Sequence, residues 1–86
     1  MEDKVKKLLN GKLDDLNLNV YSVLLEKENN NLFLRICLDG EKLDLDNIVS
    51  ATKIIDPIID DADLIDEKYV LEVYGKSKGS VEDEKN

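Results

Sequence analysis

The chain has 86 residues, of which 42% are hydrophobic and 37% are charged, a balance that suits one domain with one core. One cysteine excludes an internal disulfide framework, and the absence of histidine removes the usual zinc ligand and the usual general base. No apolar run approaches the roughly 20 residues of a membrane span and no signal-peptide stretch opens the chain, so we expect a cytoplasmic protein with no membrane partner.

The first half of the chain predicts a helix followed by a β-hairpin. A helix is predicted over residues 3–16, because apolar residues recur there at helical spacing, although Gly11 interrupts the pattern. Strands are predicted over Asn19–Glu28 and Leu32–Leu38, and the three asparagines between them tolerate the left-handed backbone of a tight turn. So short a connection predicts antiparallel pairing.

The second half predicts another helix and a closing strand. Asp44 is a candidate N-cap for a helix that runs to about Asp60, with Pro57 expected to kink or loosen its last turn. Its predicted buried stripe consists of Ile48, Ala51, Thr52, Ile55 and Ile59. Residues 68–74 alternate as a strand with one buried face, and this strand should run parallel to the strand that precedes the helix.

These elements predict an α+β fold, a two-layer sandwich with the order α-β-β-α-β. We expect a three-stranded mixed sheet with two helices on one face. The folded domain should span residues 1–74. Residues 75–86 carry a single aliphatic side chain, so we expect a disordered tail there.

The negative charge is concentrated in one part of the sequence. Residues 39–67 hold ten acidic residues against two lysines, and acids and bases balance in the rest of the chain, so this segment accounts for the net charge of −8. Such a field repels nucleic acid and favours a basic partner, although a solvated rim that only aids solubility has the same composition. The candidate partner-binding residues are Asp39, Asp44, Asp46, Asp60, Asp61, Asp63, Asp66 and Glu67.

Other motifs predict no catalytic, metal or cofactor site. The acidic run that starts at Asp61 has Asp66 where a calcium loop of EF-hand type needs glycine. Cys37 has no histidine to activate it, and its place within a strand indicates a packing residue. Residues 75–79 lack the spacing of a phosphate-binding loop. Arg35 and Glu72 are expected to pair across strands on the outer face of the sheet. We therefore expect neither an enzyme nor a cofactor.

Five short segments together resemble one protein family in their order and spacing. The residues are Leu34–Asp39, Leu43–Ile48, Thr52-Lys53, Ile59-Asp60 and Tyr69–Val73. They are similar to the N-terminal domain of the bacterial ribosome maturation factor RimP family, in which a Leu-Arg-Val strand ends in Asp and the last strand reads Tyr-x-Leu-Glu-Val. The resemblance covers roughly residues 3–74 and implies the same α-β-β-α-β fold.

The resemblance also implies a function and a difference from the family. Its members assist assembly of the small ribosomal subunit, and their N-terminal domain is thought to contact a basic ribosomal protein. They continue into a small β-barrel domain that is absent here, and Tyr74-Gly75-Lys76 replaces a Ser-Ser-Pro-Gly segment. The sequence thus predicts a non-enzymatic assembly-factor domain, either excised or stand-alone.

Two alternatives remain open at this point. One is a diverged interaction domain with another partner, which Val49 and Ile54, at the margins of the apolar stripe, could contact. The other is a direct RNA binder, which the missing basic patch and the missing Gly-x-x-Gly loop disfavour.

Overall fold

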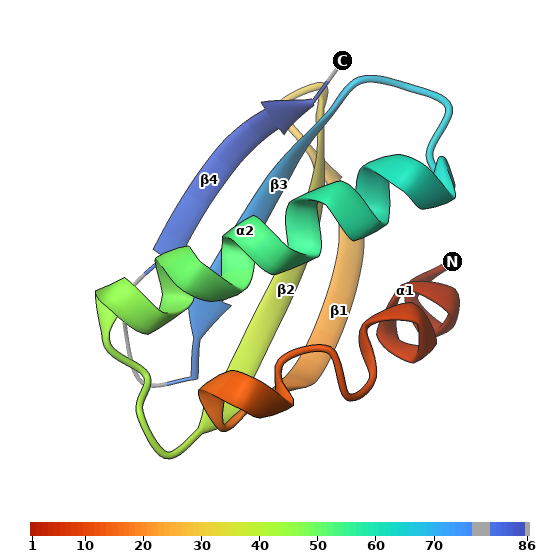
Figure 1. Ribbon diagram of the computed structural model, residues 1–86. Helices are drawn as coiled ribbons and strands as arrows, with labels where there is room; N and C mark the ends of the chain where they lie inside the picture. Colours follow the sequence, from red (N-terminus) through yellow and green to blue (C-terminus); the bar gives the residue numbers. More distant parts are fainter. Residues whose placement is uncertain (77–79, 86) are drawn as a thin grey trace.

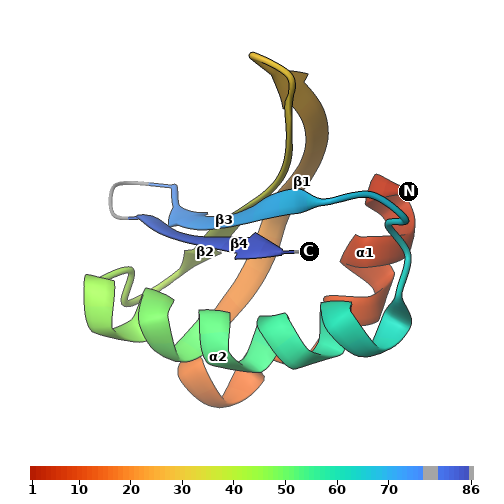
Figure 2. The same cartoon turned by 90° about the horizontal axis from the view of Figure 1, so that it is seen from above.

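The computed structural model describes residues 1–76 in full and the backbone of residues 80–85. Two helices lie on one face of a mixed sheet, which gives the two layers of an α+β fold (Figures 1 and 2). The predicted α-β-β-α-β order is confirmed. The elements are α1 (Glu2–Leu9), one 3₁₀ turn η1 (Asp14–Leu16), β1 (Leu18–Glu28), β2 (Asn31–Gly40), α2 (Leu45–Ala62), β3 (Tyr69–Gly75) and β4 (Ser80–Lys85).

The sheet follows the predicted pairing. Its strand order is β1-β2-β3-β4, with β1 and β2 antiparallel and β2 and β3 parallel. Glu28 pairs with Asn31, so the hairpin turn consists of Asn29 and Asn30 alone, and both have positive φ. This is the left-handed geometry that a two-residue turn needs to match the twist of its strands, and asparagine adopts it readily.

The predicted disordered tail is wrong for most of its length. Gly75 still belongs to β3, and Ser80–Lys85 form β4, which pairs antiparallel with β3 from Tyr69↔Lys85 to Tyr74↔Ser80. The sheet therefore has four strands where three were expected. The prediction weighed only side-chain burial, but a polar segment can satisfy its backbone groups on the free edge of a neighbouring strand. Residues 77–79 and 86 lie outside the described residues.

The predicted helix over residues 3–16 divides into two pieces. α1 ends at Leu9, and Gly11 takes a φ of +78°, which stops the helix. α1 then protects the edge of the sheet, because Glu2 accepts a hydrogen bond from the Leu25 amide (2.8 Å) and Lys6 Nζ donates one to the Tyr21 carbonyl (3.3 Å). An edge strand exposes such backbone groups unless another element covers them.

α2 confirms the prediction made from its apolar stripe. The Asp44 carboxylate accepts a hydrogen bond from the Asn47 amide (2.9 Å), as an N-cap does. All five predicted stripe residues are buried, and they face the core residues of β2 and β3. The helix continues through Pro57 to Ala62, two residues beyond its predicted end. Among the described residues, no helix is long and apolar enough to cross a membrane.

We expect Gly40→Ala to be among the most destabilising single substitutions at the surface of this fold. Gly40 ends β2 with a φ of +150°, and an added Cβ would lie 2.4 Å from the Asn17 carbonyl oxygen, on backbone that cannot move independently. The expected loss is about 2–3 kcal/mol, measured by urea unfolding. Gly11→Ala is the matched control: its Cβ meets only the Asp14 side chain at 3.7 Å, so we expect a loss of about 1 kcal/mol. Equal losses would contradict this account.

Candidate functional site

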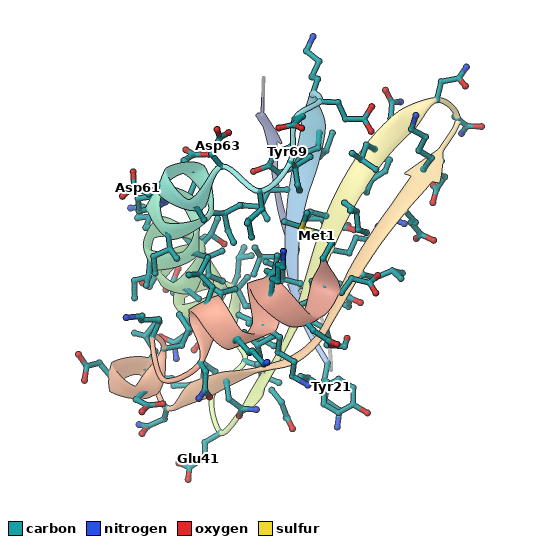
Figure 3. The ribbon with its side chains drawn as sticks, turned by 90° about the vertical axis from the view of Figure 1, so that its right-hand side faces the viewer. Met1, Tyr21, Glu41, Asp61, Asp63 and Tyr69 are labelled. Carbon is teal, nitrogen blue, oxygen red and sulfur yellow. The ribbon has the colours of Figure 1, made fainter. Side chains whose placement is uncertain are left out.

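The structure separates the predicted acidic residues into two groups. Asp44 and Asp46 lie at the start of α2, with Asp39 near them at the end of β2, whereas the other five lie at the end of the helix and in the connection to β3. Eighteen helical residues span about 27 Å, so the two groups are a full helix length apart. In Figure 3, Asp61 and Asp63 lie at one end of the molecule, and Glu41, in the loop that precedes α2, lies at the other.

The group at the start of α2 has structural roles. Asp44 is the N-cap, and Asp46 lies in the first turn, where negative charge interacts favourably with the helix dipole. Asp39 accepts a hydrogen bond from the Gly40 amide (2.9 Å) and forms an ion pair with Lys76 (3.8 Å). The fold therefore accounts for these carboxylates without a partner.

The group at the end of α2 places negative charge at the negative end of the helix dipole, and we call this group the acidic cluster. Asp60 and Asp61 occupy the last turn, Asp63 follows as the C-cap, and that turn has no basic residue. Carboxylates here lie at the negative end of the helix dipole, which disfavours them. The cluster consists of Asp60, Asp61, Asp63, Asp66 and Glu67, and Glu67 also forms an exposed ion pair with Lys27 (3.7 Å).

Asp63 adds a backbone cost to this electrostatic one. It adopts the left-handed conformation (φ 48°, ψ 48°), and its amide donates to the Ile59 carbonyl to close the helix. Glycine or asparagine usually occupies such a position. The chain thus places a carboxylate where both the helix dipole and the backbone favour a neutral residue.

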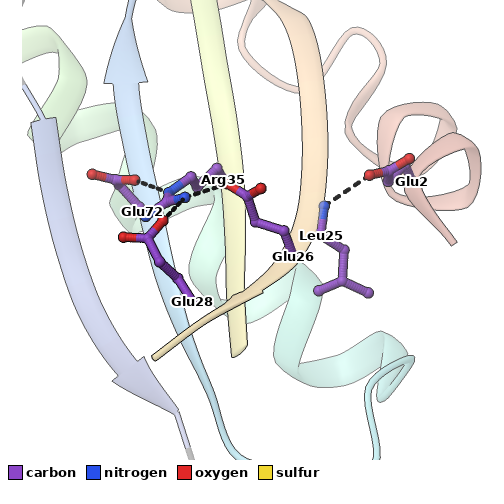
Figure 4. A network of polar contacts seen from close by, with 6 residues as sticks. All are labelled: Glu2, Leu25, Glu26, Glu28, Arg35 and Glu72. Atoms are coloured by element: carbon purple, nitrogen blue, oxygen red, sulfur yellow. Dashed lines mark hydrogen bonds and ion pairs between the residues drawn. The ribbon is translucent and has the colours of Figure 1, made fainter. Parts of the chain in front are cut away.

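A second charged arrangement lies on the outer face of the sheet, and the sequence revealed only part of it. Arg35 Nε donates to Glu72 (2.7 Å), which confirms the expected cross-strand pair. Its Nη1 also donates to Glu26 and to Glu28 (3.0 Å to Glu28), so three carboxylates from β1 and β3 surround one guanidinium (Figure 4). The guanidinium also lies 4.4 Å from the centre of the Phe33 ring. We call Arg35 and these three glutamates the Arg35 cluster.

Glu26 and Glu28 were missed because their approach to Arg35 depends on the hairpin register. The two residues are nine and seven positions before Arg35 in the chain. Leu24 lies opposite Arg35, so Glu26 and Glu28 reach Arg35 diagonally from β1 to β2. The alternation of charged residues along residues 26–28 was the available signal. The hydrogen bonds that Arg35 donates to Glu28 and to Glu72 raise the pKa of Arg35, in that order of importance, so the guanidinium stays charged.

Cys37 and Tyr74 lie next to each other on this outer face. The Cys37 thiol is free and buried, which agrees with its predicted packing role. Burial raises the pKa of the Tyr74 hydroxyl, and its contact with Cys37 raises that pKa further. Among residues 1–76 and 80–85, the side chains that the structure describes contain no group of three or more His, Cys, Asp or Glu that could hold a metal ion.

The fold and its charge distribution define a small α+β domain with an acidic helix end and a charged outer sheet face. The family model for the RimP N-terminal domain matches residues 8–75, from α1 to the last residue of β3. This chain belongs to the RimP N-terminal domain family, as the spacing of its motifs indicated. The family takes its name from the ribosome maturation factor RimP. β4 lies beyond the matched residues.

We expect the same chemical change to have opposite effects at the two ends of α2. Asp63→Asn removes an unfavourable charge and suits the left-handed backbone, so unfolding should cost about 0.5–1 kcal/mol more than in the parent chain. Asp46→Asn removes a favourable charge from the first turn and should lower stability by about 0.3–1 kcal/mol. Urea unfolding at low and high salt measures both; shifts of the same sign would contradict the assignment.

We expect Arg35 and Glu72 to be strongly coupled, because both are largely screened from water, with side chains 19% and 21% exposed. A double-mutant cycle with Arg35→Met and Glu72→Gln should give a coupling energy of about 1–2 kcal/mol. The Lys27–Glu67 pair provides the control, since both side chains are exposed and the pair should couple by less than about 0.5 kcal/mol. Equal coupling in the two cycles would show that burial adds nothing to the Arg35 cluster.

Proposed function

We propose that this chain is a non-enzymatic domain that assists maturation of the small ribosomal subunit by binding a basic ribosomal protein. Membership of the RimP N-terminal domain family supports the ribosomal role. The acidic cluster is our candidate contact surface. The place of action that the proposal implies is the cytoplasm, where ribosomal subunits are assembled.

The observation that carries this proposal is the unfavourable placement of the acidic cluster. Asp60, Asp61 and Asp63 place negative charge at the C-terminal end of α2, where the helix dipole favours a cation and the left-handed backbone of Asp63 favours glycine or asparagine. Residues that break a local rule in this way are often retained for function. A cationic partner would offset the conflict of these carboxylates with the helix dipole.

The charge of the chain favours a protein partner over RNA. With a net charge of −8, the chain repels phosphate backbones at long range and attracts a basic protein. Complementary charge of this kind mainly raises the association rate and fixes orientation, and salt weakens it. Binding through the acidic cluster should therefore fall steeply as ionic strength rises.

The test measures binding to purified basic proteins of the small ribosomal subunit by calorimetry at low and high salt. The triple variant Asp60→Asn, Asp61→Asn, Asp63→Asn should bind at least about tenfold more weakly at low salt, a change of about 1.4 kcal/mol. The triple variant Asp14→Asn, Asp15→Asn, Glu41→Gln removes the same charge from exposed residues elsewhere and should change affinity by less than about threefold.

The stability of the variants separates function from folding. The Asp63 substitution is expected to stabilise the helix end, and urea unfolding of the first triple variant tests whether weaker binding has any contribution from unfolding. Equal affinity of the parent chain and that variant for every small-subunit protein would overturn the proposed surface. Tighter binding to ribosomal RNA than to any of these proteins would overturn the proposed partner.

A further inference from the structure

The sheet has a second face that no helix of residues 1–76 or 80–85 covers. α1 and α2 both lie on one side of the sheet, and the other side is open (Figure 2). The strand register places the residues of this open face in three rows across β1, β2 and β3. The rows are Ser22–Cys37–Tyr74, Leu24–Arg35–Glu72 and Glu26–Phe33–Val70.

The open face exposes apolar side chains beside charged ones. Leu24 is 44% exposed in the central row, and Tyr21, at the bulge in β1, is 52% exposed. Phe33, Val70 and Tyr74 are half-buried on the two central strands. Aromatic and aliphatic residues that are neither buried nor scattered singly are typical of a binding surface.

The charge of the open face is negative although a cation lies at its centre. Arg35 is shared among Glu26, Glu28 and Glu72, so the Arg35 cluster carries a net charge of −2. The guanidinium is already in contact with the three carboxylates and the Phe33 ring. The Glu28 side chain, in contrast, is 55% exposed. The accessible groups around Arg35 are therefore carboxylate oxygens, which repel phosphate and accept hydrogen bonds from lysine or arginine. After β3, Lys76 lies 4.3 Å from the centre of the Tyr21 ring, and its charge is paired with Asp39 (3.8 Å).

A second copy of the chain is a poor occupant of this face. Two open faces brought together would place two clusters of the same negative sign in contact, in a chain whose net charge is already −8. A nucleic-acid strand meets the same repulsion. The combination of exposed apolar side chains with surplus carboxylates fits an amphipathic basic peptide.

We propose that the open face docks a basic segment of a partner protein. In this arrangement, an apolar side chain of the partner packs on Leu24 and Phe33, and an adjacent arginine or lysine pairs with Glu26 and Glu28. The surface lies on the opposite side of the sheet from α2, so it is distinct from the acidic cluster and extends the proposed function.

The experiment is a titration of the isotope-labelled chain with two synthetic peptides, followed by amide chemical shifts. The first peptide alternates arginine and leucine over twelve residues, and the second has serine in place of each leucine. We expect the first peptide to shift amides of β1, β2 and β3 and to bind at least about tenfold more tightly than the second. Shifts confined to residues 60–67, or equal affinity for both peptides, would overturn the proposal.

Matched variants identify the surface. Leu24→Lys should weaken binding of the arginine–leucine peptide at least tenfold, whereas Leu45→Lys, at an exposed leucine in the first turn of α2, should leave it within twofold. Glu28→Lys should weaken it more than Asp15→Lys, which changes the net charge equally from a distant exposed site. Circular dichroism confirms that each variant is folded, and equal effects within either pair would overturn the proposal.

The remaining outcomes distinguish this surface from other occupants and from the proposed function. Tighter binding of poly-uridine RNA than of the arginine–leucine peptide, or a dimer that Leu24→Lys dissociates, would overturn the proposal in favour of that occupant. The triple variant at Asp60, Asp61 and Asp63 should retain the peptide-induced shifts on β1, β2 and β3. If the triple variant abolishes these shifts while Leu24→Lys does not, the proposed docking on the open face is overturned, and the acidic cluster remains the candidate contact surface.

Discussion

The parallel pairing of β2 with β3 is the constraint on which the rest of this structure depends. Two parallel neighbours cannot be joined by a tight turn, so the chain must cross the sheet between them, and α2 makes that crossing. The apolar stripe of α2 then has one place to be buried, against Leu34, Ile36, Leu71 and Val73 on the facing side of the two strands. Once this face is packed, the two ends of α2 and the other face of the sheet are fixed as the surfaces open to partners.

The two ends of α2 differ because the helix dipole gives the same side chain opposite effects at each. At the start, Asp44 accepts a hydrogen bond from the Asn47 amide, and Asp46 interacts favourably with the dipole. At the end, carboxylates of the same type lie at the negative pole of the dipole, with no basic residue in the last turn. Composition alone counts these residues as one acidic segment, whereas the helix makes one group structural and leaves the other as the candidate contact surface.

The open face of the sheet follows a different principle. Arg35 lies between β1 and β3, and both strands supply carboxylates to it. Three carboxylates outnumber the one guanidinium, so the Arg35 cluster has a net negative charge. The hairpin register brings Glu26 and Glu28 to this point, and α1 keeps β1 from pairing elsewhere by binding its backbone through Glu2 and Lys6. A small domain thus presents two acidic surfaces on different sides, one carried by a helix end and one by strands.

The sequence by itself determined the hairpin, α2, β3 and the family. Helical spacing identified the stripe of α2, the run of three asparagines located the hairpin turn, and the order of motifs indicated the RimP N-terminal domain family, because each motif depends on residues close in the chain. Only the tertiary structure decided the break of the first helix at Gly11, the pairing of β4 and the three partners of Arg35. It also divided the acidic segment between the ends of α2. These features depend on backbone conformation, on a free strand edge and on register, which the local pattern of side chains does not encode.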